Sequence, residues 1–149
     1  MLDLKELLNP DSFLFIQNPR SKKMVFDKIC KEAFEKYDID KNLLLNNVIK
    51  REKIGTTTIG NGIAIPHVQN DQIIKPCCIV AILSDGLDFD ALDNNPVDLI
   101  VSLILPEVSK PENLQILAQI SRLLRNTEIT DKLRAVSYTH LTLPTKDSV

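Results

Sequence analysis

The stretch VDLIVSLIL (97–105) is an almost unbroken apolar run of valine, isoleucine and leucine. CCIVAIL (77–83) is a second run of the same kind. A strand with one face in water alternates apolar and polar residues, whereas a strand covered on both faces is apolar throughout. The two runs therefore predict strands of a sheet that carries helices on both faces.

Shorter segments around these runs extend the predicted sheet. FLFIQ (13–17) suits an edge strand, and IAI (63–65) suits a short strand that ends at Pro66. The connection SDGLDFDALDNNP (84–96) is rich in turn residues. Residues 55–62 hold three of the four glycines of the chain and predict a loop.

Two helices are predicted ahead of this loop. Ser21 is a good N-cap for apolar side chains that recur at helical spacing over about 22–37. Asp40 precedes a second helix, which should run to about Glu52 with Gly55 shortly past its end.

Two more helices are predicted after the second long run. Ser109 and Glu112 form a capping box ahead of a helix to about Arg125, and a last helix should follow with Thr127 or Thr130 as its cap. Helices and strands are mixed along the chain, so the predicted class is α/β in a single domain, with helices on both faces of the sheet.

Composition excludes several classes of protein. The chain has 149 residues, a net charge of -2 and no basic stripe, which argues against nucleic acid or an anionic membrane as the main partner. No apolar run approaches the roughly 18 residues of a membrane span, and the first residues do not resemble a signal peptide. We expect a cytoplasmic protein without membrane insertion.

The three cysteines, Cys30, Cys77 and Cys78, do not have the spacing of a zinc or redox motif. Adjacent strand residues point to opposite faces, so Cys77 and Cys78 should not share one site. We expect all three to be reduced and buried as small apolar side chains.

The C-terminal stretch VSYTHLTLPT (136–145) departs from the composition of the rest of the chain and shows no helical period. It is similar over its whole length to a translated sequencing adapter. We therefore expect a domain over 1–135, a tail of artificial origin over 136–149, and a natural gene that continues differently after Ala135. His140 is excluded from the predicted site for this reason.

The stretch TTTIGNGIAIPH (56–67) carries the main candidate for chemistry, His67. A neutral imidazole is a nucleophile at physiological pH, and threonine hydroxyls with glycine-loop amides suit a bound phosphoryl group. The alternative is an incidental histidine, which is the commoner role of a single histidine. The loop does not have the order of a nucleotide-binding P-loop.

Arg51 and Asn113 are further candidates for an anion site. Arg51 lies in the last turn of its predicted helix, where it could bind phosphate or only complement the helix dipole. Asn113 lies in the first turn of another helix, where anions bind readily, although an ordinary polar residue is the simpler interpretation. The aspartates of 85–98 fit no calcium loop and are interpreted as turn residues. No metal or cofactor is predicted.

REKIGTTTIGNGIAIPH (51–67) resembles the active-site signature of enzyme IIA domains of the fructose–mannitol class, part of the phosphoenolpyruvate-dependent sugar phosphotransferase system. FDALDNNPVDLIVSLILPE (89–107) is similar to the segment that follows in this class, most of all in its nitrogen-related, regulatory members. The resemblance covers about 2–134.

This resemblance implies a mixed sheet flanked by helices, and a phosphoryl group accepted by His67 from the phosphocarrier protein HPr or its nitrogen-related paralogue. It implies that Arg51 and the loop threonines contact that group, and that transporting members pass it to an enzyme IIB domain. Many members carry a second histidine where this chain has Asn113, which cannot titrate. The closing helix of the family is expected to be missing.

The leading prediction is a phosphoryl carrier. His67 is the nucleophile, loop donors of Thr56, Thr57 and Thr58 join Arg51 in stabilising the phosphoryl oxygens, and Asn113 orients the ring or the phosphate. Proteins in such a role need an apolar docking rim, for which the candidates are Ile59, Ile63 and Val68.

Two alternatives stay open. In the first, phosphorylation of His67 only switches affinity for a regulatory target, such as a kinase or an ion transporter. The second is a histidine-dependent hydrolase. It is weaker because the chain lacks an evident serine or cysteine nucleophile motif.

Overall fold

The computed structural model describes residues 7–8, 10–106 and 111–142. Its centre is an antiparallel pair of long strands, β5 (Cys77–Leu87) and β6 (Val97–Pro106), in which Val80 lies opposite Val101. Both predicted apolar runs are thus strands, and β5 continues into the segment that was expected to be turn. β1 (Phe13–Ile16) pairs in parallel with β5 at the sheet edge, as predicted.

The other side of β6 pairs with two short strands in succession. β3 (Ile63–Ala64) and β4 (His67–Asn70) both run parallel to β6, so that Ile63 lies opposite Leu99 and His67 opposite Leu103. β2 (Thr58–Gly60) pairs antiparallel with β3 and completes a mixed, six-stranded sheet. The sequence did not predict β2 or β4.

The turn between β2 and β3 needs left-handed backbone conformations. Gly60, Asn61 and Gly62 have φ angles of 97°, 57° and 78°. Glycine adopts these angles without strain, and asparagine tolerates them better than most residues. The two glycines that suggested a loop therefore form the tight turn of a hairpin.

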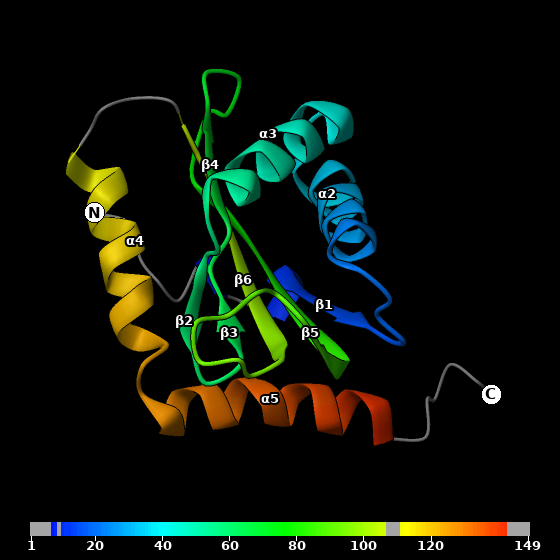
Figure 1. Ribbon diagram of the computed structural model, residues 1–149. Helices are drawn as coiled ribbons and strands as arrows, with labels where there is room; N and C mark the ends of the chain where they lie inside the picture. Colours follow the sequence, from blue (N-terminus) through cyan, green and yellow to red (C-terminus); the bar gives the residue numbers. More distant parts are fainter. Residues whose placement is uncertain (1–6, 9, 107–110, 143–149) are drawn as a thin grey trace.

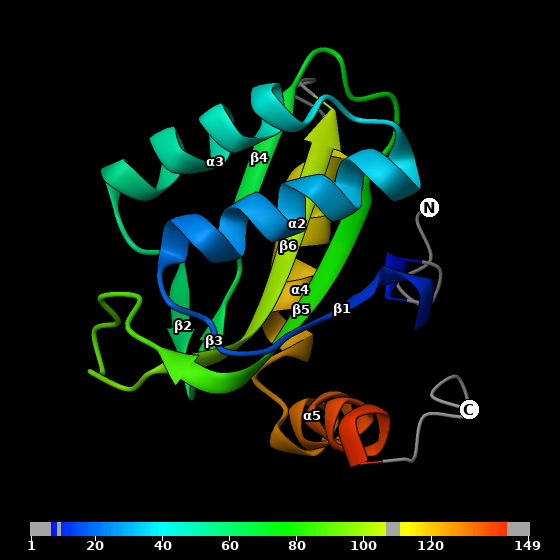
Figure 2. The ribbon, with the colours of Figure 1, turned by 90° about the vertical axis from the view of Figure 1, so that its right-hand side faces the viewer.

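Helices cover both faces of the sheet, as predicted (Figures 1 and 2). α2 (Lys22–Tyr37) and α3 (Lys41–Ile54) pack over one core cluster, which includes Ile29, Val48 and Ile104. α4 (Pro111–Leu123) packs over the other cluster, which includes Leu103 and Ile120. The sheet is apolar on both sides because each face is covered.

The ends of α2 and α3 follow from their caps. The Ser21 hydroxyl accepts a hydrogen bond from the Met24 amide at 3.1 Å, and the Asp40 carboxylate accepts one from the Leu43 amide at 3.0 Å. Both helices begin where predicted. α3 runs two residues past Glu52, to Ile54, and Gly55 is its C-cap. The predicted cap Ser109 lies outside the described residues, and α4 ends at Leu123, slightly short of the predicted Arg125.

α5 (Thr127–Thr142) crosses the end of the sheet in Figure 1. Thr127 is its first residue and not its cap as predicted, since the side chain of Asn126 accepts a hydrogen bond from the Glu128 amide at 3.0 Å. The backbone of α5 continues through Val136 to Thr142, so this stretch is helical although its sequence shows no helical period. Residues 136–142 contain neither glycine nor proline, and Pro144 is the first residue that would stop a helix.

The cysteines are free and buried. Cys77 and Cys78 belong to the clusters on opposite faces of the sheet, as the strand alternation predicts. Burial, with a smaller contribution from Asp27, raises the pKa of Cys30 to about 12. None of the helices in the described residues is long and apolar enough to cross a membrane.

Candidate functional site

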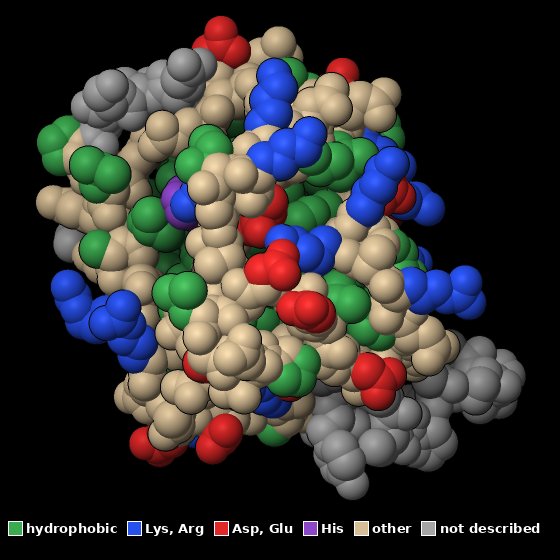
Figure 3. Space-filling model, viewed as in Figure 1, with side chains coloured by type: hydrophobic (Ala, Val, Ile, Leu, Met, Phe, Trp, Pro, Cys, Tyr) green, Lys and Arg blue, Asp and Glu red, His purple; other side chains and the backbone are tan. Residues whose placement is uncertain are grey.

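His67 is the first residue of β4 and lies opposite Leu103 of β6. The next residue, Val68, points into the α2–α3 cluster, so strand alternation places the His67 side chain on the face covered by α4. The side chain is half-buried. Figure 3 shows a histidine at the surface between α4 and the strands, bordered by hydrophobic side chains.

The imidazole contacts a backbone carbonyl two residues earlier in the chain. His67 Nδ1 lies 2.9 Å from the carbonyl oxygen of Ile65. A carbonyl oxygen can only accept a hydrogen bond, so Nδ1 carries the proton in this arrangement. The lone pair of the neutral ring is then on Nε2, which makes Nε2 the nucleophilic atom.

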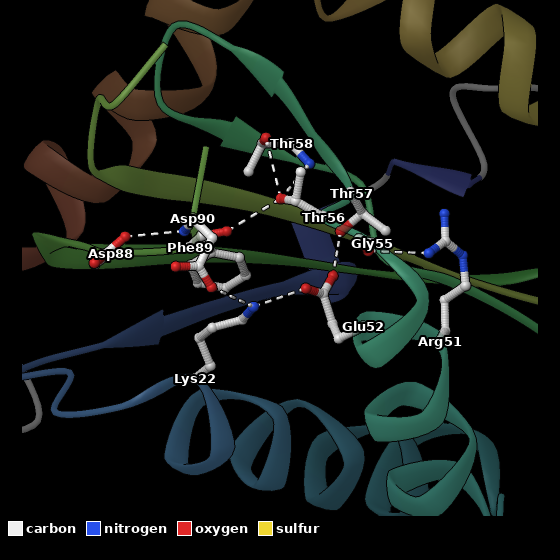
Figure 4. A network of polar contacts seen from close by, with 10 residues as sticks. All are labelled: Lys22, Arg51, Glu52, Gly55, Thr56, Thr57, Thr58, Asp88, Phe89 and Asp90. Carbon is white, nitrogen blue, oxygen red and sulfur yellow. Dashed lines mark hydrogen bonds and ion pairs between the residues drawn. The ribbon is translucent and has the colours of Figure 1, made fainter. Parts of the chain in front are cut away.

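The threonines between α3 and β2 form hydrogen bonds within the fold (Figure 4). Thr57 is buried and donates to Glu52 Oε1 at 2.6 Å. Thr56 Oγ1 donates to the Phe89 carbonyl at 3.1 Å and lies 3.2 Å from Thr58 Oγ1. The Thr57 hydroxyl is therefore committed to Glu52, whereas Thr56 and Thr58 are partly exposed.

Arg51 lies in the last turn of α3, as predicted. Its Nη1 donates to the Gly55 carbonyl at 3.1 Å. In Figure 4 the guanidinium points toward Gly55, the residue before the three threonines. In this structure Arg51 satisfies a carbonyl at the end of its own helix, which is the simpler of the two predicted roles.

Asn113 lies in the first turn of α4 and is 6% exposed. It shares the buried stripe of that helix with Ile116 and Ile120, so it faces the same side of the sheet as His67. Its Nδ2 donates to the carbonyl of Pro106 at 3.0 Å. Pro106 is three residues beyond Leu103, the partner of His67, or roughly 10 Å along the strand. The amide thus ties α4 to the end of β6.

The predicted docking rim needs correction. Ile63 is 2% exposed and Val68 is 7% exposed, because they point into the cores on the two faces of the sheet. Neither side chain can contact a partner. Ile59 is partly exposed, and Leu114 of α4, next to Asn113, is 69% exposed. Ile59 and Leu114 are thus the apolar side chains of this region that a partner could reach.

Sequence reasoning missed the charged pair at the base of the loop. Lys22 Nζ lies 2.8 Å from Glu52 Oε2, and the Glu52 side chain is only 7% exposed. A lysine in the first turn of a helix and a glutamate in the last turn both oppose the helix dipole. Those two unfavourable positions were the signal in the sequence that could have revealed the pair.

The aspartates of the β5–β6 connection act within turns. Asp93 accepts hydrogen bonds from the backbone amides of Asn95 and Asn61, and these bonds lower the pKa of its carboxyl group. Asp98, at the start of β6, pairs with Arg134 of α5 at 2.8 Å. The described residues contain no cluster of histidine, cysteine, aspartate and glutamate that could hold a metal ion.

Comparison with known proteins places this geometry in context. The chain is 38% identical over 136 residues to the nitrogen regulatory protein of Pseudomonas aeruginosa, covering 91% of this chain and 88% of that protein. The crystal structure of nitrogen regulatory protein IIA-Ntr from Neisseria meningitidis superposes with a TM-score of 0.79 at 25% identity, covering 88% of this chain and 90% of that one.

The fold is shared more widely. Mannitol enzyme IIA of Escherichia coli, solved in complex with phosphorylated enzyme IIB, matches with a TM-score of 0.67 at 14% identity, covering 94% of this chain and 92% of the solved chain. Residues 6–141 match the family model described as phosphoenolpyruvate-dependent sugar phosphotransferase system, EIIA 2. The chain therefore belongs to the type 2 enzyme IIA family of the sugar phosphotransferase system.

Proposed function

We propose that the chain is a phosphoryl carrier whose His67 accepts a phosphoryl group on Nε2 from HPr or its nitrogen-related paralogue. The observation that carries this proposal is the hydrogen bond from Nδ1 to the Ile65 carbonyl. It fixes one ring nitrogen as the proton carrier and leaves the other as a nucleophile at a half-buried surface position.

The transfer is a displacement at phosphorus. The Nε2 lone pair forms a bond to the phosphorus atom while the bond from phosphorus to the donor breaks, and its electron pair returns to the donor. The imidazole gains positive charge and keeps its Nδ1 proton. The Ile65 carbonyl, which accepts that proton's hydrogen bond, stabilises the charged ring.

The phosphoryl oxygens need donors that can reach them, even where these donors must give up a bond that they make in the unphosphorylated protein, as Thr56 does with the Phe89 carbonyl. Thr56 and Thr58 are partly exposed, and Arg51 can exchange its bond to the Gly55 carbonyl for a bidentate contact with phosphate. Asn113 contributes by fixing the start of α4 on the same face as His67. Thr57 donates its hydroxyl to Glu52, so in this proposal it supports the loop and its hydroxyl is not a phosphate donor.

Labelled phosphoenolpyruvate, enzyme I and HPr provide the test. The chain should acquire phosphate that is labile in acid and stable in base, and His67→Ala should abolish this label. His140→Ala removes the other histidine of the chain and should label like the parent. Full labelling of His67→Ala would assign the phosphate to another residue.

A regulatory output is the second candidate, and the 38% identity to a nitrogen regulatory protein favours it. Phosphate on His67 adds negative charge on the side of the sheet where Leu114 is exposed, and added charge changes the affinity of a surface for a protein partner. Onward transfer to an enzyme IIB domain is the transport alternative, since the mannitol relative was solved with such a domain.

The two outputs differ in the fate of the phosphoryl group. After HPr is removed, a protein that serves sugar transport should transfer its labelled phosphate rapidly to added enzyme IIB. A regulatory protein keeps the label and instead shows different affinity for its target in the two states. We expect the second behaviour.

A further inference from the structure

A continuous chain of polar contacts links the first turn of α2 to the His67 ring. Lys22 Nζ contacts Glu52 Oε2 at 2.8 Å, and Glu52 Oε1 accepts from Thr57 Oγ1 at 2.6 Å (Figure 4). The Thr57 carbonyl then accepts from the Ile65 amide at 2.9 Å, and the Ile65 carbonyl accepts from His67 Nδ1 at 2.9 Å. Four successive contacts thus join helix α2 to the imidazole.

We propose that Glu52 is a positioning residue, which sets the tautomer and orientation of His67 through Thr57 and the Ile65 peptide. The inference rests on the proposed function for its biological meaning, because a fixed tautomer matters only if Nε2 is the reacting atom. The contacts themselves belong to the unphosphorylated protein.

Burial explains why Glu52 can act in this way. Its side chain is 7% exposed and Thr57 is 6% exposed, so water does not replace either partner easily. Each carboxylate oxygen has one partner, Lys22 on one side and Thr57 on the other. A hydrogen bond to a charged acceptor is short and directional, so the Thr57 backbone is held in one position.

The Thr57 backbone in turn holds the Ile65 peptide through a hydrogen bond. The bond from the Ile65 amide to the Thr57 carbonyl extends the β2–β3 pairing by one step, and Pro66, which follows, donates no backbone hydrogen bond of its own. The Pro66 carbonyl accepts from Leu103 in β6. The Ile65 carbonyl is therefore positioned by Thr57 on one side and by β6 on the other.

The locations of Lys22 and Glu52 in their helices favour a positioning role over simple stabilisation of either helix. Lys22 lies in the first turn of α2 and Glu52 in the last turn of α3, and each position is unfavourable with respect to its own helix dipole. Lys22 also lies over the ring of Phe89, 5.1 Å from its centroid. The pair is favourable only when α2, α3 and the loop are assembled around it.

Two-bond proton–nitrogen NMR of the histidine rings in the full chain tests the proposal, because it reports the tautomer without any phosphoryl transfer. In the parent, Nδ1 of His67 should be protonated and Nε2 unprotonated at a pH where the ring is neutral. Thr57→Val, nearly isosteric but without the hydroxyl, should shift the signals toward exchange between tautomers. Thr57→Ser should restore the parent pattern.

Kinetics provide the second measurement. Thr57→Val and Glu52→Ala should lower kcat/KM for phosphorylation by HPr about tenfold or more, as removal of an orienting partner does elsewhere. Glu32→Gln is the matched control, since Glu32 pairs with Lys36 within α2 and lies outside the chain of contacts. It should leave both the tautomer and the rate unchanged.

The outcomes separate the two hypotheses. A folded Thr57→Val protein with the parent tautomer overturns the positioning role of Glu52, whatever its rate. A changed tautomer with no phosphorylation of the parent by HPr supports the positioning chain and contradicts the proposed function. If Glu52→Ala fails to fold, Thr57→Val and Thr57→Ser still show whether the chain of contacts sets the His67 tautomer.

Discussion

At the scale of single residues, the sequence singled out the segment of the proposed site but only part of its surroundings. A glycine-rich stretch, threonines and a histidine pointed to His67, whose role stays a proposal. The sequence could not show that the Thr57 hydroxyl is committed to Glu52, because that contact depends on how the loop folds back on α3. Burial of Val68 was missed because the strand that orients it was itself missed. Burial of Ile63 was missed because the short predicted strand did not show that both of its faces are covered.

Arg51 provides a test of how far the anion site extends. Arg51→Ala should slow phosphorylation of His67 about tenfold, since a bidentate donor to the phosphoryl oxygens is lost. Its effect on stability should be small, about 0.5 kcal/mol, because the bond to Gly55 is at an exposed helix end. Labelling kinetics with urea unfolding measures both. Lys53→Ala removes the same charge from the same helix turn and should leave the rate unchanged.

The buried thiol of Cys30 predicts a pH dependence of stability. Its pKa is raised from 9.0 to about 12 in the folded protein, chiefly by burial, so the folded state retains a proton that the unfolded chain loses. Stability from this group is fully present below pH 9.0 and is lost as the pH rises toward about 12.

Urea unfolding of the parent and of Cys30→Ala across this window measures the effect. The difference in unfolding free energy between them should shrink by up to about 1.4 kcal/mol per pH unit above the unfolded pKa. Comparing the two proteins cancels the titration of lysines and tyrosines. If the unfolding free energies of the two proteins change in parallel with pH, the Cys30 thiol does not cause the loss of stability.

At the scale of elements, prediction succeeded where the signal was local. The caps Ser21 and Asp40 set the starts of α2 and α3, and two long apolar runs set β5 and β6. β4 was missed because HVQN has a single apolar residue, and its strand character comes from parallel pairing with a distant part of the chain. A four-residue strand of this kind has no pattern of its own to detect.

The contact between β5 and the start of β6 explains a glycine that no turn requires. A Cβ atom at Gly86 would lie 2.6 Å from Pro96 Cβ, far closer than real carbon atoms approach. Gly86→Ala should therefore cost about 1–3 kcal/mol of unfolding free energy, as overpacking does in other proteins. Thermal and urea unfolding measure it.

Gly55→Ala is the matched control, because nothing lies within 4 Å of its added Cβ and its backbone is extended. It should change stability by less than about 1 kcal/mol, in either direction. Equal losses in both variants would mean that the contact with Pro96 does not decide the effect, since chain entropy by itself favours alanine.

At the scale of the whole molecule, Arg134 and Leu133 connect α5 to the rest of the fold. Arg134 donates to Asp98 Oδ1 at 2.8 Å and to the Asn61 carbonyl at 2.8 Å, so it joins the last helix to β6 and to the β2–β3 turn. Leu133, beside it, packs partly buried against the α4-side core. Both anchoring residues precede Ala135, where the proposed natural part of the sequence ends.

The origin of the tail remains a proposal. The similarity to a sequencing adapter begins at Val136, yet the family match extends to residue 141 and the helix to Thr142. A helix without glycine or proline can continue through an arbitrary sequence, so helical backbone does not distinguish the two origins. Resequencing the gene across the codons of 135–137 decides it, since a natural tail would be encoded there again.

Stability of shortened chains tests what the tail contributes to the fold. A chain ending at Ala135 keeps Leu133 and Arg134 and should unfold cooperatively, within about 1 kcal/mol of the full chain, since frayed helix ends add little. A chain ending at Asn126 loses both anchors and should be less stable by about 2 kcal/mol or more, from one partly buried leucine and one charged hydrogen-bonded pair. Urea unfolding at equal protein concentration compares the full chain with the two shortened chains. An equal loss in both shortened chains would place the stabilising contacts in 136–149 and would contradict a domain boundary at Ala135.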